Sequence, residues 1–140
     1  MKTKDYILVE NVLTPALYRE MHEVCHFKEY DLEDIKIALD HDLYDVVVYD
    51  GDRAVAIARV VGDGRIVFFL KDVIVHPDYQ HQGCGELIMK AFFNYLSKHA
   101  CKGAYVGLMA TPGVEKFYAK YGFIERPTEG LGSGMVLFYE

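Results

Sequence analysis

The chain has 140 residues, of which 51% are apolar and 14% aromatic, so a single domain over residues 1–140 with a buried core is predicted. Its net charge of −6 argues against a nucleic-acid partner, because few cations are left to neutralise phosphates. The apolar runs are only of strand length, which predicts no membrane contact, and three cysteines without a Cys-x-x-Cys pair favour a reduced, cytoplasmic protein.

The first third of the chain predicts one strand and two helices. Tyr6–Val9 is a short apolar strand. Thr14-Pro15 has the residue types of a helix N-cap and first helical position, and apolar residues at helical spacing predict a helix to about Phe27. Asp31 is predicted to cap the second helix.

The middle of the chain predicts an antiparallel meander of three strands. Leu43–Tyr49, Arg53–Val61 and Arg65–Val75 are rich in Val, Ile and Phe. Asp-Gly sequences separate the three runs, and Asp-Gly between apolar runs is a strong signal for a hairpin turn.

A strand, a turn and a helix follow one another over residues 72–88. The strand ends before Pro77, and Gly83 and Gly85 precede an amphipathic helix. Glycine lets the backbone approach a ligand, and a helix start presents free N–H groups, so the pattern fits a phosphate site. It lacks the Lys-Ser/Thr of a P-loop and the third glycine of a dinucleotide fold. The same glycines also fit a tight turn without a ligand.

The last third predicts a strand, a helix and two further strands. Ala104–Met109 is predicted as a short buried strand, parallel to the strand before the glycines. Thr111-Pro112 is predicted to begin a helix that ends at Gly122. Short strands are predicted at residues 123–124 and Met135–Tyr139.

Two motifs together resemble a known family. Val75-x-Pro77-x-Tyr79-Gln80-x-x-Gly83-x-Gly85-x-x-Ile88 closely resembles the acetyl-CoA signature of the GNAT N-acetyltransferase superfamily, and the sequence from Phe117 to Phe123, FYAKYGF, resembles that family's Phe-Tyr-x-x-x-Gly-Phe. The resemblance implies an α+β fold: a GNAT-like mixed sheet with an antiparallel meander, a β-α-β acetyl-CoA unit and flanking helices.

The resemblance also implies acetyl-CoA as co-substrate and no metal. The backbone that would hold the pyrophosphate comprises Gln80, His81, Gln82, Gly83, Cys84 and Gly85. The strand that would pair with the pantetheine arm comprises Val73, Ile74 and Val75. A backbone amide near Val73 would stabilise the oxyanion.

Two side chains are predicted to be catalytic. Tyr118 matches the family's proton donor, and a phenol with a pKa near ~10 is protonated at neutral pH and can protonate a thiolate. Packing in the core is the alternative role for Tyr118. Asp72 is a candidate general base, because desolvation in the sheet is expected to raise its pKa, and an ordinary strand-end aspartate is the alternative. His76 is a further candidate base.

Two other groups of residues suggest chemistry less strongly. His22, Cys25 and His26 share one helix face, but a fourth metal ligand is not evident, so ordinary half-buried histidines are favoured. Cys84 lies at a helix start, which favours its thiolate, but no motif supplies a partner, so it is interpreted as a variable loop residue.

The sequence therefore predicts an acetyl-CoA-dependent N-acetyltransferase that acts on a primary amine of a small molecule or peptide by direct attack in a ternary complex. The alternative is a GNAT-fold module that binds acyl-CoA without turnover, as a sensor or regulatory subunit. The resemblance also implies a possible homodimer through the final strands.

Overall fold

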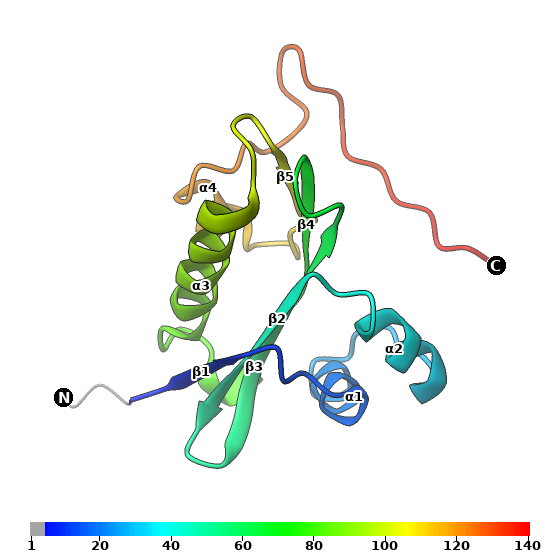
Figure 1. Cartoon of the computed structure of the whole chain (residues 1–140), viewed down its shortest axis with the longest axis vertical. Helices are drawn as coiled ribbons and strands as arrows, with labels where there is room; N and C mark the ends of the chain where they lie inside the picture. Colours follow the sequence, from blue (N-terminus) through cyan, green and yellow to red (C-terminus); the bar gives the residue numbers. More distant parts are fainter. Residues whose placement is uncertain (1–4) are drawn as a thin grey trace. The chain divides into compact units, whose positions relative to one another are not determined.

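A computed structural model describes residues 5–140 of the chain (Figure 1). The chain forms two compact units, Met1–Val106 and Gly107–Glu140, and each is described by itself. The single-domain organisation stays a prediction.

The first unit contains most of the secondary structure. In chain order its elements are β1 (Ile7–Glu10), α1 (Pro15–Val24), α2 (Leu32–Leu39), β2 (Tyr44–Asp50), β3 (Arg53–Gly62), β4 (Val67–Val75), the short 3-10 helix η1 (Pro77–Tyr79), α3 (Cys84–His99) and the start of β5 (Tyr105–Gly107). Every strand and helix predicted up to His99 is confirmed, with bounds that differ by at most a few residues.

The five strands form one mixed sheet in the order β1-β2-β3-β4-β5. Neighbouring strands from β1 to β4 are antiparallel. Helix α3 connects β4 to β5, and a connection through a helix is the way in which parallel neighbours are joined. The amide of Tyr105 donates to the carbonyl of Ile66 at 2.7 Å, so β5 begins beside the start of β4. The predicted α+β fold is confirmed.

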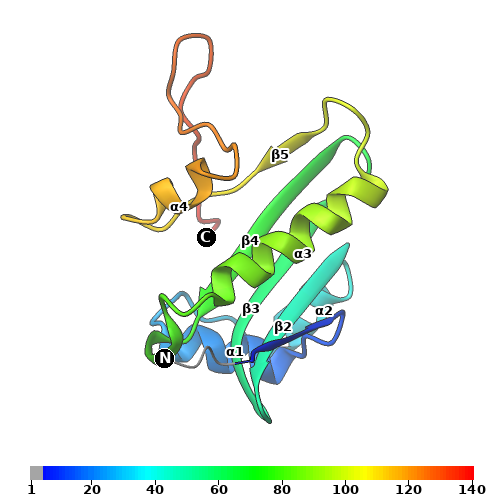
Figure 2. The ribbon, with the colours of Figure 1, turned by 90° about the vertical axis from the view of Figure 1, so that its left-hand side faces the viewer.

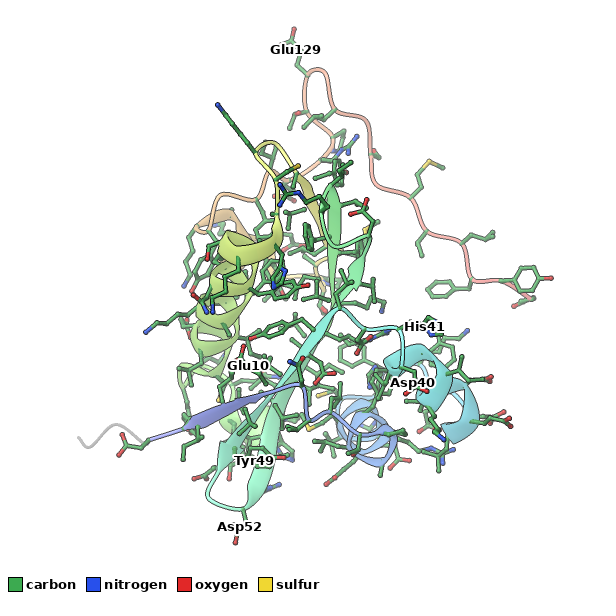
Figure 3. The ribbon with its side chains drawn as sticks, in the orientation of Figure 1. Glu10, Asp40, His41, Tyr49, Asp52 and Glu129 are labelled. Carbon is green, nitrogen blue, oxygen red and sulfur yellow. The ribbon has the colours of Figure 1, made fainter. Side chains whose placement is uncertain are left out.

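Local sequence explains the tight turn between β2 and β3. Asp50 pairs with Arg53, which leaves a two-residue loop in which Gly51 has a φ of 60°. Glycine adopts this left-handed conformation without a steric penalty. Asp52 lies at the exposed tip of this hairpin (Figure 3).

The sheet has helices on both faces. Helix α3 lies along one face, and α1 and α2 lie on the other (Figure 2). Because both faces are covered, Val55, Ala56 and Ile57 on β3 are all 0% exposed, although consecutive residues of a strand point to opposite faces. On the side of α1, a core cluster comprises Tyr18, Met21, Ile35, Val47, Ile57 and Ile74.

The second unit holds only one regular helix, α4 (Glu115–Ala119). The predicted helix start at Thr111-Pro112 is wrong, because Gly113 has a φ of 92°, which is incompatible with an α-helix. The predicted end at Gly122 is confirmed by its φ of 97° and by the bond from the Phe123 amide to the Tyr118 carbonyl, as in helix C-caps.

Two strands predicted at the end of the chain are absent, and a third is only partly confirmed. Residues 123–124 and Met135–Tyr139 are irregular, and the side chain of Met135 is 89% exposed. Strand propensity reflects packing against neighbours, and no described backbone pairs with these residues in a ladder. The predicted strand 104–109 is confirmed only as β5, and it is not fully buried, since Tyr105 is 58% exposed.

Candidate active site

The segment between β4 and α3 forms a compact turn. After Val75, His76 accepts a bond from the Asp78 amide through Nδ1 at 3.1 Å, which starts η1. His81 and Gly83 then have φ values of 63° and 95°. Two left-handed residues so close together reverse the chain within a few residues, and Gly83 becomes the N-cap of α3.

The start of α3 leaves backbone donors unpaired within the helix. The amide of Leu87 is bonded to the Gly83 carbonyl at 3.1 Å, so the amides of Cys84 and Gly85 precede the first intrahelical bond. A Cβ built on Gly83 would find no atom within 4 Å, so open space lies beside these amides. Free amides, space and the positive end of a 16-residue helix suit a bound phosphate.

Side chains of the same segment hold its shape. Gln80 Nε2 donates to the Val75 carbonyl at 3.3 Å, and Gln82 Nε2 donates to the Asp78 carbonyl at 3.1 Å. The Tyr6 hydroxyl also donates to Gln82 Oε1. The predicted loop residues from Gln80 to Gly85 therefore form one ordered turn directly after the predicted strand Val73–Val75. Which of them bind a cofactor stays a prediction.

Cys84 is poorly suited to be a nucleophile. Its side chain is 1% exposed, and burial, then the charges of Glu86 and Asp50, raises the pKa of its thiol. The expectation that the helix start favours its thiolate is wrong, because burial is the largest cause of the raised pKa. Its interpretation as a loop residue is also wrong, since Cys84 is the first residue of α3.

Asp72 lies at an irregularity in β4. The pairing of β3 with β4 shifts register between Ile57 and Arg59, and Asp72, on the opposite strand, has a φ of 55°. Aspartate is one of the few residue types that tolerate this left-handed conformation. An extra residue in one strand leaves backbone groups outside the ladder, here beside Val73.

The Asp72 carboxylate is surrounded by donors. Oδ1 accepts from His22 Nε2 at 3.1 Å and from Lys71 Nζ at 3.2 Å. Oδ2 accepts from the Tyr18 hydroxyl at 3.0 Å and from the Arg59 guanidinium at 3.2 Å. The side chain is only 6% exposed, so four donors from α1, β3 and β4 enclose it.

The pKa of Asp72 is shifted in the opposite direction from the prediction. Burial alone would raise it, but the hydrogen bond from His22 and the charges of Lys71, His22 and Arg59 outweigh burial and hold the pKa well below its usual range. The predicted rise is therefore wrong. A carboxylate that binds protons so weakly is a poor general base.

The His22 ring connects α1 to Asp72, and each of its two nitrogens faces a hydrogen-bond acceptor. Nδ1 faces the Tyr18 carbonyl at 2.8 Å and Nε2 faces Asp72 at 3.1 Å. Neither acceptor can donate, so only the doubly protonated ring satisfies both bonds. The His22 ring also stacks on the Tyr18 ring, with centroids 3.9 Å apart. The favoured interpretation of His22 as an ordinary half-buried histidine fits this arrangement better than a metal ligand does, although the residue is fully buried, at 4% exposure.

A second buried carboxylate lies on the other side of Arg59. Asp42 Oδ1 accepts from Arg59 Nε at 2.8 Å, whereas Asp42 Oδ2 has no partner among the described residues. The side chain is 3% exposed, and burial raises its pKa to about 6 despite the hydrogen bond and charge of Arg59. Figure 3 shows Asp40 and His41 just before it, where the chain leaves α2.

Tyr118 lies in the second unit, on α4. It is 9% exposed, and its ring makes edge contacts with Phe117 and Phe123 at centroid distances of 5.2 and 6.0 Å. Within residues 5–140 no hydrogen bond to its hydroxyl is found. Burial raises the pKa of the phenol, so it stays protonated at neutral pH.

Sequence reasoning missed the partners of Asp72. Tyr18 and His22 are spaced by four residues on α1, so they share one helix face, and Arg59 is a charge inside an otherwise apolar strand. A charge at such a position needs a buried partner. This signal predicts an ion pair, but it does not identify the carboxylate 13 residues away.

Other features add no chemistry. Among residues 5–140, no group of three or more His, Cys, Asp or Glu side chains is arranged to hold a metal ion. No helix in the described part of the chain is long and apolar enough to cross a membrane. A pocket of about 270 Å³ lies between β2 and the end of α3, beside the stacked rings of Tyr44 and Tyr95, and none of the predicted site residues lines it.

Comparison with known proteins gives consistent results. Residues 42–125 match the model of a family described as an acetyltransferase (GNAT) domain. The chain is 30% identical over 128 residues to an uncharacterized N-acetyltransferase, ycf52, of Porphyra purpurea, with 86% of this chain and 72% of that protein covered. It is 35% identical over 113 residues to the chloroplastic GCN5-related N-acetyltransferase 1 of Arabidopsis thaliana, with 79% and 55% covered.

A solved structure is similar over nearly the whole chain. It is a protein of unknown function from methicillin-resistant Staphylococcus aureus, named a "Probable Acetyltransferase", with a TM-score of 0.86 and 31% identity. The match covers 96% of this chain and all of that one. The chain spans between about half and three quarters of the length of the curated relatives that it matches.

Proposed function

Because the chain belongs to the GNAT acetyltransferase family, we propose that it transfers an acetyl group from acetyl-CoA to a primary amine of a small molecule or peptide. The observation that carries this proposal is the turn between β4 and α3, with the left-handed Gly83 as N-cap and the amides of Cys84 and Gly85 at the helix start. Binding both substrates in one ternary complex lets the amine attack the thioester directly, and most of the rate comes from positioning.

Each part of the site has a proposed role. The amides from Gln80 to Gly85 bind the pyrophosphate, and Val73–Val75 pairs with the pantetheine arm. The amine nitrogen forms a bond to the acetyl carbon and releases a proton to solvent, the carbon–sulfur bond breaks, and the CoA thiolate leaves. Tyr118 protonates that thiolate and regains a proton from solvent. The base role of Asp72 stays a prediction, and its lowered pKa counts against it.

Binding of CoA tests the loop assignment directly. A ligand that binds only the folded state stabilises it by about 2.7 kcal/mol at 100 times its dissociation constant, so CoA should raise the melting temperature. Gly83→Asp should abolish this rise, because it places a carboxylate beside the free amides. Gly103→Asp is the matched control, since Gly103 also has a positive φ, of 81°, and open space.

The control separates backbone strain from loss of the phosphate site. Both variants should lose intrinsic stability, but only Gly83→Asp should lose the response to CoA. A protein that responds to NAD or ATP and not to CoA would overturn the loop assignment. Release of CoA thiol across a panel of amines then separates an enzyme from the alternative acyl-CoA-binding module, which would bind CoA and release no thiol with any amine.

We further propose a homodimer that uses the C-terminal apolar run from Met135 to Tyr139. These five side chains are between 63% and 93% exposed, and contiguous apolar surface of this kind marks an interaction site. Deleting residues 135–140 should convert a dimer into a monomer in sedimentation experiments. A wild-type monomer at micromolar concentration would contradict the proposal. A cytoplasmic location stays a prediction, since one relative is named as chloroplastic.

A further inference from the structure

We propose that Asp72 is a positioning residue that ties helix α1 to the irregularity in β4, rather than a general base. Its carboxylate, the two α1 side chains Tyr18 and His22, and Arg59 on β3 form one connected group, called here the Asp72 network. This inference rests on the proposed acetyl transfer, because it assigns a role to the strand on which the thioester is expected to lie.

The backbone at Asp72 needs external support. A residue with a positive φ that is not glycine costs about 1–3 kcal/mol and persists only where its surroundings enforce it. Here the carboxylate accepts four hydrogen bonds, and they come from three different elements. Charged hydrogen bonds of this kind are stronger than neutral ones, so the Asp72 network is well suited to hold the left-handed conformation.

The donors on α1 are themselves fixed. The His22 ring stacks on Tyr18 and binds its carbonyl, so neither ring can rotate without breaking a contact. Both side chains are almost fully buried, at 6% and 4% exposure. The helix that carries them also places Met21 in the core cluster that includes Ile74, two residues beyond Asp72.

The consequence concerns the residues directly after Asp72. At the irregularity, backbone polar groups of β4 lie outside the sheet ladder, and preorganised backbone amides are effective at stabilising an oxyanion. Holding Asp72 in its left-handed conformation fixes the orientation of the peptide that joins it to Val73. The carboxylate thus acts on geometry, and it neither accepts a proton nor touches the substrate.

The test compares Asp72→Asn with the wild type across pH 6 to 9. Asparagine keeps the shape but removes the charge that holds Lys71, His22 and Arg59. We expect kcat/KM to fall by roughly 10- to 100-fold, in line with the cost of a small misplacement, and by the same factor at every pH. Recovery at high pH would overturn the proposal, because that is the behaviour of a lost general base.

Two more variants make the result specific. Tyr18→Phe removes one of the four donors and should lower kcat/KM in the same pH-independent way, by about 3- to 10-fold. It carries the test if Asp72→Asn does not fold. Asp45→Asn is the control: Asp45 is also a buried carboxylate, at 8% exposure, that accepts from the Leu13 amide at 3.0 Å. It should lose stability with kcat/KM unchanged. An unchanged kcat/KM in folded Tyr18→Phe and Asp72→Asn would overturn the proposal.

A second measurement does not depend on activity. Amide hydrogen exchange should become faster at residues 71–74 in Asp72→Asn or, if that variant does not fold, in Tyr18→Phe, and not in Asp45→Asn. If the wild-type protein acetylates no amine, the proposed function fails, but the exchange experiment still decides whether the Asp72 network holds the strand. Unchanged exchange at residues 71–74 would overturn the inference.

Discussion

Asp72 and Tyr118 are the two side chains for which catalytic roles were predicted, and their surroundings differ in kind. Asp72 is held by four donors on α1, β3 and β4, whereas Tyr118 on α4 is surrounded by aromatic rings. The hydrogen-bonding capacity of the Asp72 carboxylate is therefore taken up by donors of the protein itself. No hydrogen bond of the Tyr118 hydroxyl is found within the described residues, which supports the proposal that it is the proton donor.

Removing the Tyr118 hydroxyl should have the largest effect. General-acid help contributes typically about 10²–10⁴-fold, so Tyr118→Phe should lower kcat by roughly that factor and leave CoA affinity close to that of the wild type. The low end applies if the thiolate leaves easily without a proton. Steady-state rates and CoA binding should be measured on the same variant.

Tyr121→Phe is the matched control for this prediction. Tyr121, like Tyr118, precedes Gly122 in the chain, and its ring also contacts Phe117, with ring centroids 5.4 Å apart. Tyr121→Phe therefore removes a hydroxyl from the same aromatic cluster. Its kcat should stay within about threefold of the wild type, since we assign this ring a packing role. Full activity in Tyr118→Phe would end its role as proton donor, and loss of folding would support a core role.

A smaller effect should distinguish the two carboxylates that flank Arg59. The folded-state pKa of Asp72 is lowered, so its stabilisation is present above its unfolded pKa near ~4 and is lost as the pH falls. The pKa of Asp42 is raised to about 6, so its contribution is complete below pH ~4 and is lost as the pH rises through about 6.

Urea unfolding between pH ~2.5 and ~7.5 measures this difference. Asp72→Asn should destabilise the protein by about 1–3 kcal/mol at pH 7, and the loss should shrink only as the pH falls below about 4. Asp42→Asn should show the reverse trend, with a smaller loss at pH 7 than at pH 4. If the destabilisation caused by the two substitutions changed with pH in the same direction, the pKa values of Asp72 and Asp42 would not be shifted in opposite directions.

The sequence by itself determined the elements whose signals are local. The left-handed glycines mark element boundaries: Gly51 follows the end of β2, Gly122 follows the end of α4, and Gly83 precedes the start of α3. The apolar period fixes the type of element between such boundaries. The turn between β4 and α3 was also predictable, because its glycines, Pro77 and the helix that follows are contiguous in the chain. The same local rules failed for Met135–Tyr139, because a strand needs a paired neighbour and no sequence signal shows whether one is present.

Only the tertiary structure decided the chemical state of Asp72. Its burial was predictable from the pattern of β4, and burial alone would raise its pKa. The pKa of Asp72 is lowered instead, because two residues of α1 bring donors to the carboxylate: Tyr18 and His22, which lie 54 and 50 residues earlier in the chain. Arg59 adds a positive charge from the neighbouring strand. A pKa depends on the charges within a few ångströms, and that neighbourhood is set by how the elements pack.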